Sequence, residues 1–477
     1  MKLIYQPQDK PKFSQLIPFA FQQLLAIMAA TIAVPNIIGH GMSPAAALFG
    51  AGIGTIVYLL FTKFKSPVFL GSSFAFLSSM AAAFAGGVSM SLGYLGIIIG
   101  AAFAGLVYVV IAIIVKFTGA GWVSKLMPAV VIGPTVAIIG LSLAGNAVGD
   151  LFKGNVTHGV EQEVIQNHQV VMETIQVQNA NAYICLVIGL ITLAVTMLCS
   201  VYGKKMAKMI PFIIGICAGY IVAAVLTVIG NATNTPDLQI INFSLFQNMK
   251  WYPEFTFLTA FTGGYDPGEA GTIGAYIGTI AIAYIPVAFV VFAEHIADHK
   301  NISSIIEKDL LKEPGLHRTL LGDGIGSMAG AFFGGCPNTT YGESIGCVAI
   351  SGNASVITIL VTGIMAVVIS FIAPFSTFLS TIPSCVMGGV CMALYGFIAV
   401  SGLKMLQKVD LEDNRNLFVA SVILIAGIGG MVLTFGSITI TSVACALILG
   451  ILTNVMLSGK KKAAEKAEAE AAEEKEE

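Results

Sequence analysis

The sequence predicts an all-α polytopic membrane protein whose fourteen transmembrane segments form a 7+7 inverted repeat. Three observations lead to this prediction. Hydrophobic residues make up 56% of the chain and charged residues only 10%, whereas a soluble domain carries about 25% charge. Apolar runs of about 20 residues, the length that crosses a bilayer as a helix, recur along the chain. Two of these runs, seven segments apart, are interrupted in the same way.

The apolar runs can be placed one after another along the 477 residues. Twelve of them read as ordinary membrane helices, and the third and tenth contain too many Ser, Thr, Gly and Pro residues to do so. The expected segments are 17–38, 46–61, 69–86, 93–115, 127–147, 180–201, 209–230, 271–297, 316–335, 336–352, 355–375, 379–400, 416–435 and 438–458.

The interrupted segments, 69–86 and 336–352, are expected to begin as short extended strands and to continue as half-helices. These half-helices would start near Ala75 and near Ser344. An odd number of segments per half inverts the second half in the membrane, and broken helices at matching positions of inverted halves indicate a binding site near the bilayer midplane. The free N–H groups of the two half-helices would converge there and could donate to carbonyl oxygens or anions.

The distribution of positive charge fixes the expected orientation. With fourteen segments, 22 of the 24 Lys and Arg residues lie on the side of the two termini, and only Lys153 and Lys250 lie opposite. Cytoplasmic loops carry such an excess of positive charge. We therefore expect a multi-pass protein of the inner (plasma) membrane with both termini in the cytoplasm. Residues 148–179 and 231–268 are expected as outer loops.

Three carboxylic acids lie within or beside apolar runs. Glu294 ends the run IAIAYIPVAFVVFAEH, Asp298 follows four residues later on the same helical face, and Glu343 opens the second half-helix. An ionised side chain at mid-bilayer costs roughly 2.5–3.5 kcal/mol, so such residues usually face a cavity and carry function. Glu343 would also stabilise the start of its half-helix. Asp323 is weaker evidence for a site, because a hydrogen bond between packed helices explains it better.

Other side chains are expected beside these acids. Phe74 and Tyr341 lie at the two chain breaks, where their rings could stack on a ligand, and Tyr395 lies in a similar setting. Gln23 is an amide in the first segment that needs hydrogen-bond partners. The backbone at Gly342 would line the gap between the half-helices.

The chemistry of this set favours a neutral, planar ligand rich in N–H groups. Carboxylates accept N–H hydrogen bonds, and no Lys or Arg near the site could neutralise an anion. A carboxyl group held away from water favours its protonated form, so it could carry a proton across the membrane with the ligand. The eight cysteines form no CxxC pair. Because they also lie almost wholly within apolar runs, we expect them to be buried apolar side chains and expect no metal site. We also expect no cofactor, no enzyme activity and no nucleic-acid partner.

At these residues the chain resembles the nucleobase–ascorbate transporter family, in its bacterial uracil permease branch. The similarity covers about residues 13–458, and sulfate-type anion transporters, which share only a fold, would not show PNTTYGE. The matching stretches are LGSSFAF (70–76), AEH (293–295), KDLLKEPGLHR (308–318), PNTTYGESIG (337–346) and PSCVMGGVCMALYG (383–396).

The resemblance implies proton-coupled uptake of uracil by an elevator-type movement of a core domain against a gate domain, commonly in a homodimer. It implies that Glu294 and Glu343 hold the N–H edge of the pyrimidine and that Glu294 and Asp298 handle the proton. Backbone near Phe74 and Gly342 would contact its carbonyl groups. Ala30, Tyr341 and Tyr395 would line the pocket, with Gln23 beside it. The implied parts are an N-terminal arm (1–16), core (17–115 and 271–375), gate (119–230 and 379–458) and a charged cytoplasmic tail (459–477).

Two residues depart from the uracil pattern, and four alternatives stay open. Gln23 and Asp298 stand where histidines are common, and an acid at the second position is more typical of the purine branch. The purine signature, Gln-Asn-x-Gly followed by Thr-Arg, is absent from the tenth segment. A xanthine or guanine permease is therefore the nearest alternative. Sodium coupling, a channel, and an intramembrane protease using Asp298 with Asp323 are the others.

Overall fold

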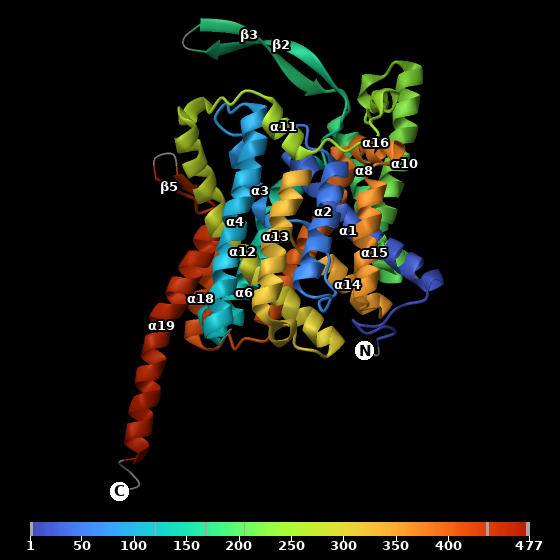
Figure 1. Cartoon of the computed structure of the whole chain (residues 1–477). Helices are drawn as coiled ribbons and strands as arrows, with labels where there is room; N and C mark the ends of the chain where they lie inside the picture. The colour runs from blue at the N-terminus through green and yellow to red at the C-terminus, as the bar shows by residue number, and fades with distance from the viewer. Residues whose placement is uncertain (1–2, 120, 167–168, 205, 436–437, 474–477) are drawn as a thin grey trace.

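The computed structural model describes residues 3–119, 121–166, 169–204, 206–435 and 438–473. Within them, eight helices are long and apolar enough to cross a membrane. They form a bundle, and the N-terminal segment and the end of α19 lie at the same end of it (Figure 1). The eight are α1 (Phe13–Ile38), α2 (Pro44–Phe61), α4 (Met90–Thr118), α6 (Ala129–Ser142) joined to α7 (Ala144–Asp150), α8 (Ala182–Tyr202), α10 (Pro211–Thr233), α12 (Ile273–Ile306) and α17 (Ser384–Leu406).

The other six expected segments contain helices that are too short, interrupted or, as in α13, not apolar enough, so the number fourteen stays a prediction. Segment 355–375 does not form one straight span, because α15 and α16 meet at an angle of 87°. Pro374 lies in the first turn of α16, where proline is favoured, and it could not continue α15. The further helices are α5 (Gly121–Leu126), α9 (Met206–Met209), α11 (Thr256–Thr262), α13 (Leu316–Gly334), α15 (Val356–Ile369), α16 (Ala373–Thr381), α18 (Asn414–Ile428) and α19 (Ser442–Glu473).

The two interrupted segments have the expected form of strand followed by half-helix. In the first, β1 (Leu70–Ser72) leads through the 3₁₀ turn η1 (Phe74–Phe76) into α3 (Leu77–Ala83). In the second, β4 (Asn338–Thr340) leads into α14 (Gly342–Ser351). The two strands pair antiparallel, with Leu70 opposite Thr340. Each strand thus satisfies the backbone of the other, as irregular chain inside a membrane protein requires.

The helices pack in two groups. In the first group, α13 packs along α2 and α4, α12 along α4, α15 along α1 and α2, and α14 against α1. In the second group, α17 packs along α6, α7 and α8, α10 along α8, and α18 and α19 against each other and α6. The groups meet where α12 contacts α6 and α19, and where α1 contacts α10 and α17.

The first expected outer loop, 148–179, contains a β-hairpin instead of irregular chain. Its strands β2 (Thr157–Gln166) and β3 (Gln169–Gln178) pair antiparallel and lie at the end of the bundle opposite the chain ends (Figure 1). Both strands contain β-branched Val, Ile and Thr residues among polar ones, a composition that favours a pleated, half-exposed surface. The second outer segment, 231–268, contains η2 (Pro236–Leu238), η3 (Phe243–Asn248) and α11. A short hairpin, β5 (Leu433–Phe435) with β6 (Ile438–Ile440), precedes α19.

The N-terminal arm is shorter than expected and is fastened to the first group. Helix α1 begins at Phe13, within the expected arm 1–16. The backbone N–H groups of Ile4 and Tyr5 donate to the carbonyl oxygen of Gly352, at 2.7 and 3.1 Å. Val356 donates back to the carbonyl oxygen of Pro7 at 3.0 Å. The arm therefore holds the loop that follows α14.

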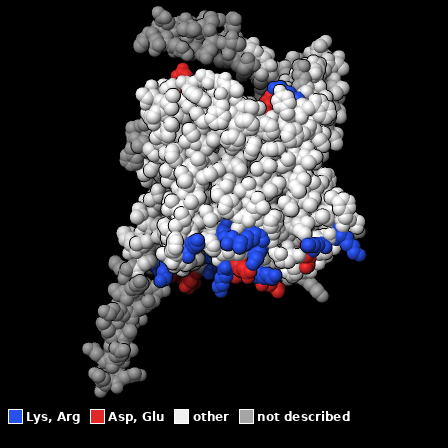
Figure 2. All heavy atoms as spheres, in the orientation of Figure 1, with Lys and Arg blue, Asp and Glu red and all other residues white. Residues whose placement is uncertain are grey.

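Basic side chains gather at the end of the bundle where the N-terminal segment lies, which we call the basic face. Figure 2 shows Lys and Arg side chains along this edge, while the middle of the visible surface is uncharged. The loops expected on this side are 62–66, 116–126, 202–208, 298–318 and 401–415. An uncharged belt with positive charge at one end is typical of an integral membrane protein.

Candidate functional site

Helix α12 brings Glu294 and Asp298 to one cavity. The two residues are four apart, so they share a face of the helix, and both are half-buried. They line a cavity of about 270 Å³. This volume is just below the range of sites for drug-sized ligands, so the cavity suits a small molecule.

The second chain break supplies the third acid. Tyr341 precedes the first turn of α14, and Glu343 lies in that turn. Gly342 and Glu343 line the same cavity as the acids of α12. The start of a helix presents free N–H groups and a positive dipole end. Donor groups and a carboxyl group thus lie side by side at this break.

A hydrogen bond joins the two acidic elements. The Thr340 hydroxyl, at the end of β4, donates to Asp298 Oδ2 at 2.7 Å. Thr340 itself lines the cavity. This bond fixes the level of α12 relative to the second chain break. Thr340 was not singled out from the sequence, although it lies within the motif PNTTYGE.

The first chain break contributes an aromatic ring and backbone. Phe74, the first residue of η1, lines the cavity together with Ser72. The Phe74 ring lies edge-on to the ring of Tyr395, with the ring centres 5.4 Å apart. Tyr395 is buried behind Phe74 and does not line the cavity itself. Tyr341, from the other break, does line it.

Gln23 and Ala30, expected beside the pocket, do not reach the cavity. Gln23 is buried and donates from Nε2 to the Ser344 hydroxyl at 2.5 Å and to the Ser344 carbonyl at 3.2 Å. Ala30 is fully buried. On the same face of α1, Ala26 lines the cavity instead. A sequence pattern fixes the face of a helix but not the level at which a cavity meets it.

Asp323 lies away from the cavity, in the helix-packing role expected for it. Its Oδ2 lies 2.7 Å from Nδ1 of His295, and both side chains are fully buried. Among the described residues, neither side chain lines the cavity that contains Glu294. His295 therefore turns away from the site, as its position next to Glu294 predicts.

The second group of helices closes the other side of the cavity, and sequence reasoning missed its residues. Apart from Lys208, they are small or apolar side chains like many others in the chain, so no local signal distinguishes them. Their place depends on how the two groups dock. They are Val136 on α6, Ser200 on α8, Lys208 on α9, Pro211 and Phe212 on α10, and Phe397, Ile398 and Ser401 on α17.

The cavity extends toward the basic face. Ser200, Lys208, Asn301 and Ser401 line it, and each lies in or next to one of the loops of that face. Lys208 is exposed. A lysine at this edge was not expected, because the sequence placed no basic residue near the site.

The comparisons with known proteins agree on the family of this chain. Residues 14–435 match the model of a permease family, Xan_ur_permease. The chain is 38% identical to the uracil permease of Bacillus caldolyticus, over 96% of this chain and 95% of that protein. It is 34% identical to the uracil permease of Escherichia coli K12, over 93% of this chain and 91% of that protein.

Solved structures with low sequence identity share the fold. The transmembrane domain of the cyanobacterial bicarbonate transporter BicA has a TM-score of 0.58 at 15% identity, covering 94% of this chain and 99% of that domain. The murine anion transporter Slc26a9, in an inward-facing state, has a TM-score of 0.62 at 12% identity, covering 95% of this chain and 69% of that protein. At these identities the similarity shows the fold alone.

Proposed function

This chain belongs to the nucleobase–ascorbate transporter family, and we propose that it imports uracil together with a proton across the plasma membrane. Its family consists of permeases, so the chain is a transporter and not an enzyme. The observation that carries the proposal is the placing of Glu294 and Glu343, from an intact helix and a broken one, on one small cavity. Relatives over nearly the whole chain are uracil permeases.

In this proposal the two glutamates bind the N–H edge of the base. Uracil carries ring N–H donors and carbonyl acceptors in one plane, and carboxylate oxygens only accept. Hydrogen bonds to a charged carboxylate are about twice as strong as neutral ones, and a protonated carboxyl group still accepts through its carbonyl oxygen, so the two contacts orient the ring in either protonation state. Glu343 reaches the ligand from α14 and Glu294 from α12.

The opposite edge of the base then meets the chain breaks. Free backbone N–H groups near Gly342 and near Phe74 donate to the carbonyl oxygens of uracil. The ring of Phe74, held edge-on by Tyr395, covers one face of the base. Tyr341 lines the pocket beside it.

The proton is carried by the acids of α12 in our proposal. Glu294 contacts the ligand, and Asp298 lies one turn closer to the basic face with its hydrogen bond from Thr340. Desolvation by a bound base favours a protonated carboxyl group, and hydration after its release favours the ionised one. Replacing Asp298 by Asn would therefore abolish uphill accumulation while leaving exchange of labelled for unlabelled uracil.

Transport proceeds by movement of the first group of helices, the core, against the second, the gate. Fourteen segments in two inverted halves, a homodimer, and a cytoplasmic basic face complete the proposed arrangement. The packing of helices within each group, with fewer contacts between the groups, supports relative movement. The cavity reaches toward the basic face, which fits a state open to the cytoplasm.

Uptake into proteoliposomes tests the function. We expect labelled uracil to accumulate when the outside is more acidic than the inside, at constant sodium, and to stop accumulating when a protonophore is added. Glu294→Gln and Glu343→Gln should abolish accumulation. Unchanged uptake in both variants, or no uptake by the unaltered protein, contradicts the proposal.

A purine permease is the second candidate, and Asp298 favours it, since an acid there resembles the purine branch. Competition separates the two. Inhibition of labelled-xanthine uptake by unlabelled xanthine or guanine, without inhibition by uracil or 5-fluorouracil, would establish the second candidate.

A further inference from the structure

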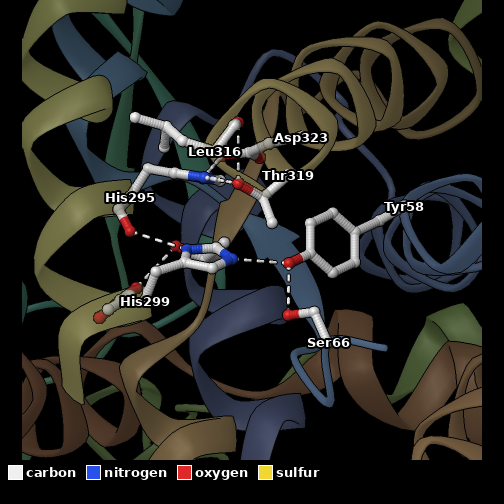
Figure 3. Close-up of polar contacts among 9 residues, drawn as sticks. Tyr58, Ser66, His295, His299, Leu316, Thr319 and Asp323 are labelled. Carbon is white, nitrogen blue, oxygen red and sulfur yellow. Dashed lines mark hydrogen bonds and ion pairs between the residues drawn. The ribbon is translucent and has the colours of Figure 1, made fainter. Parts of the chain in front are cut away.

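Helix α12 carries two pairs of polar residues at the same spacing. Glu294 and Asp298 lie on the stripe that faces the cavity, and His295 and His299 lie on the neighbouring stripe, about 100° around the helix. Both histidines are fully buried. Figure 3 shows them pointing toward Thr319, Asp323 and Tyr58. The histidine stripe has no part in the binding scheme above.

The hydrogen-bond partners of His295 determine which of its ring nitrogens carries a proton. Nε2 lies 3.0 Å from the Thr319 hydroxyl, which donates its own single proton to the carbonyl oxygen of Leu316 at 3.0 Å. The ring must therefore donate from Nε2. One further proton then lies between Nδ1 and Asp323 Oδ2, which are 2.7 Å apart.

This remaining proton makes the pair neutral in either arrangement. A protonated Asp323 donates to a neutral ring, or a charged ring donates to a carboxylate, and the sum of charges is zero in both. A lone buried charge is costly, whereas a paired or neutral couple is tolerated. Asp323 Oδ1 has no hydrogen-bond partner among the described residues, so the couple rests on the single bond through Oδ2.

His299 fastens the same stripe one turn further along. Its Nδ1 donates to the carbonyl oxygen of His295 at 2.8 Å, so Nε2 is the atom that meets the Tyr58 hydroxyl, at 2.7 Å. That hydroxyl also bonds Ser66 at 2.7 Å. The two imidazole rings stack with centres 4.0 Å apart. Helix α12 is thus fastened to α13, α2 and the loop after α2, all in the first group.

We propose that His295 and Asp323 form a positioning couple, aided by His299 and Tyr58, that fixes the rotation of α12 and so keeps Glu294 and Asp298 facing the cavity. The proposal rests on the proposed function, because it assigns those acids to the transport site. The reason is that His295 and Glu294 are consecutive residues of the same helix. A rotation that moved His295 off Asp323 would turn Glu294 away from the ligand by the same angle. A relay of protons along the stripe does not fit, because His299 donates to the backbone carbonyl oxygen of His295 and not to a ring nitrogen, and that oxygen cannot pass the proton on.

A pair of substitutions at Asp323 separates positioning from charge. Asp323→Asn can donate from its amide to Nδ1 while the ring keeps its bond to Thr319. Asp323→Leu has a similar size but leaves Nδ1 without a partner. We expect the dissociation constant for uracil to rise about tenfold in the Leu variant and to stay within about threefold in the Asn variant, the range expected for a buried polar group left unpaired or paired.

A second pair of substitutions tests the contact between His299 and Tyr58 by removing one of two equally buried tyrosine hydroxyl groups. Tyr58→Phe removes the hydroxyl that meets His299 and Ser66. Tyr284→Phe removes a hydroxyl on α12 that is equally buried but has no partner among the described residues. We expect weaker uracil binding in the first variant and unchanged binding in the second. Equal binding in both would contradict the role of His299.

The measurements distinguish positioning from a loss of folding and from a wrong ligand. Calorimetric titration is done well below the melting temperature of each ligand-free variant, because a merely structural role lowers that temperature and leaves the dissociation constant unchanged.

Cysteine labelling measures the rotation of α12 directly. Ala297→Cys, on the cavity side of α12, is introduced into a background without the native cysteines. We expect Asp323→Leu, and not Asp323→Asn, to change the rate at which this cysteine reacts with a polar maleimide.

Each outcome bears on one proposal. Unchanged binding and labelling in Asp323→Leu would overturn the positioning couple. Equal losses in the Leu and Asn variants would also overturn it, since the ionisable carboxyl group and not the hydrogen bond would then be needed. A protein that binds no uracil but shows the expected labelling rates would overturn the proposed substrate and support the couple.

Discussion

The two chain breaks have the same backbone form and different chemistry. Each is a three-residue strand followed by a short helix, and the strands pair with each other. The break before α3 carries no acid in its first turn and offers Phe74, whereas the break before α14 offers Glu343. The difference teaches that a shared backbone form gives the two breaks similar geometry, while single residues give them different chemistry, which in our proposal decides which edge of the base each break meets.

The breaks also differ in how tightly they are packed. At the first, a Cβ atom added to Gly71 would lie 2.3 Å from the ring of Tyr341. At the second, a Cβ atom added to Gly342 would meet only Asp298 Oδ1, at 4.0 Å. The first break is therefore tightly packed against its neighbour, and the second is open toward the cavity.

Removing the acid from the second break should have the largest effect. Glu343→Gln keeps the shape of the side chain and loses the charge, so we expect the dissociation constant for uracil to rise roughly 10- to 100-fold, the value of a hydrogen bond to a charged group. Calorimetric titration measures it. Glu307→Gln, at the exposed end of α12, is the control and should bind as the unaltered protein. Equal binding by both variants would contradict the assigned chemistry.

A methyl group added at each break tests the difference in packing. Gly71→Ala should lower the free energy of unfolding by about 1–3 kcal/mol, because the ring of Tyr341 must move. Gly342→Ala should leave stability almost unchanged and affect binding alone. Thermal melting in detergent, with and without uracil, measures both. A larger loss of stability from Gly342→Ala than from Gly71→Ala would show that the second break, and not the first, is the more tightly packed.

The support behind the second break can be removed from α1. Gln23→Leu loses the hydrogen bonds to Ser344, and we expect a loss of about 1–2 kcal/mol in stability with a smaller change in affinity. Gln23→His keeps a donor and should recover part of the loss. A Leu variant that melts like the unaltered protein would show that α14 is held by other contacts.

The ring at the first break should have the smallest effect. Phe74→Leu removes the ring that covers one face of the base in our proposal, and an aromatic contact is worth about 0.5–1.5 kcal/mol, so affinity should fall by roughly two- to tenfold. Competition binding with labelled uracil resolves a change of this size. Unchanged affinity would mean that Phe74 fills space beside the ligand without stacking on it.

The sequence predicted the parts of the site that depend on local composition. Both breaks were expected because Ser, Gly, Thr and Pro cannot sustain a membrane helix, and α14 begins two residues before the expected Ser344. Glu294 and Asp298 were expected together because the helical period places them on one face. These signals lie within one segment each.

The sequence did not predict what depends on distant segments. Gln23 bonds Ser344 across 321 residues, and Phe212 and Phe397 reach the cavity only because the second group of helices docks against the first. The hairpin within 148–179 was missed because its polar residues outweighed its Val and Ile residues. Ala26 lines the cavity and Ala30 does not, because of the position of α1 along its axis relative to α14.

The pairing of the two breaks has a consequence for biosynthesis. Phe69 and Ser344, which join by a hydrogen bond from the Phe69 N–H, are 275 residues apart in the sequence. At 5–20 residues per second, a ribosome needs roughly 15–55 s to supply the second strand after the first. During that interval the backbone of β1 has no strand partner, and lipid cannot satisfy it. The nascent chain therefore needs the insertion machinery, or a temporary partner, to shelter β1 until β4 arrives.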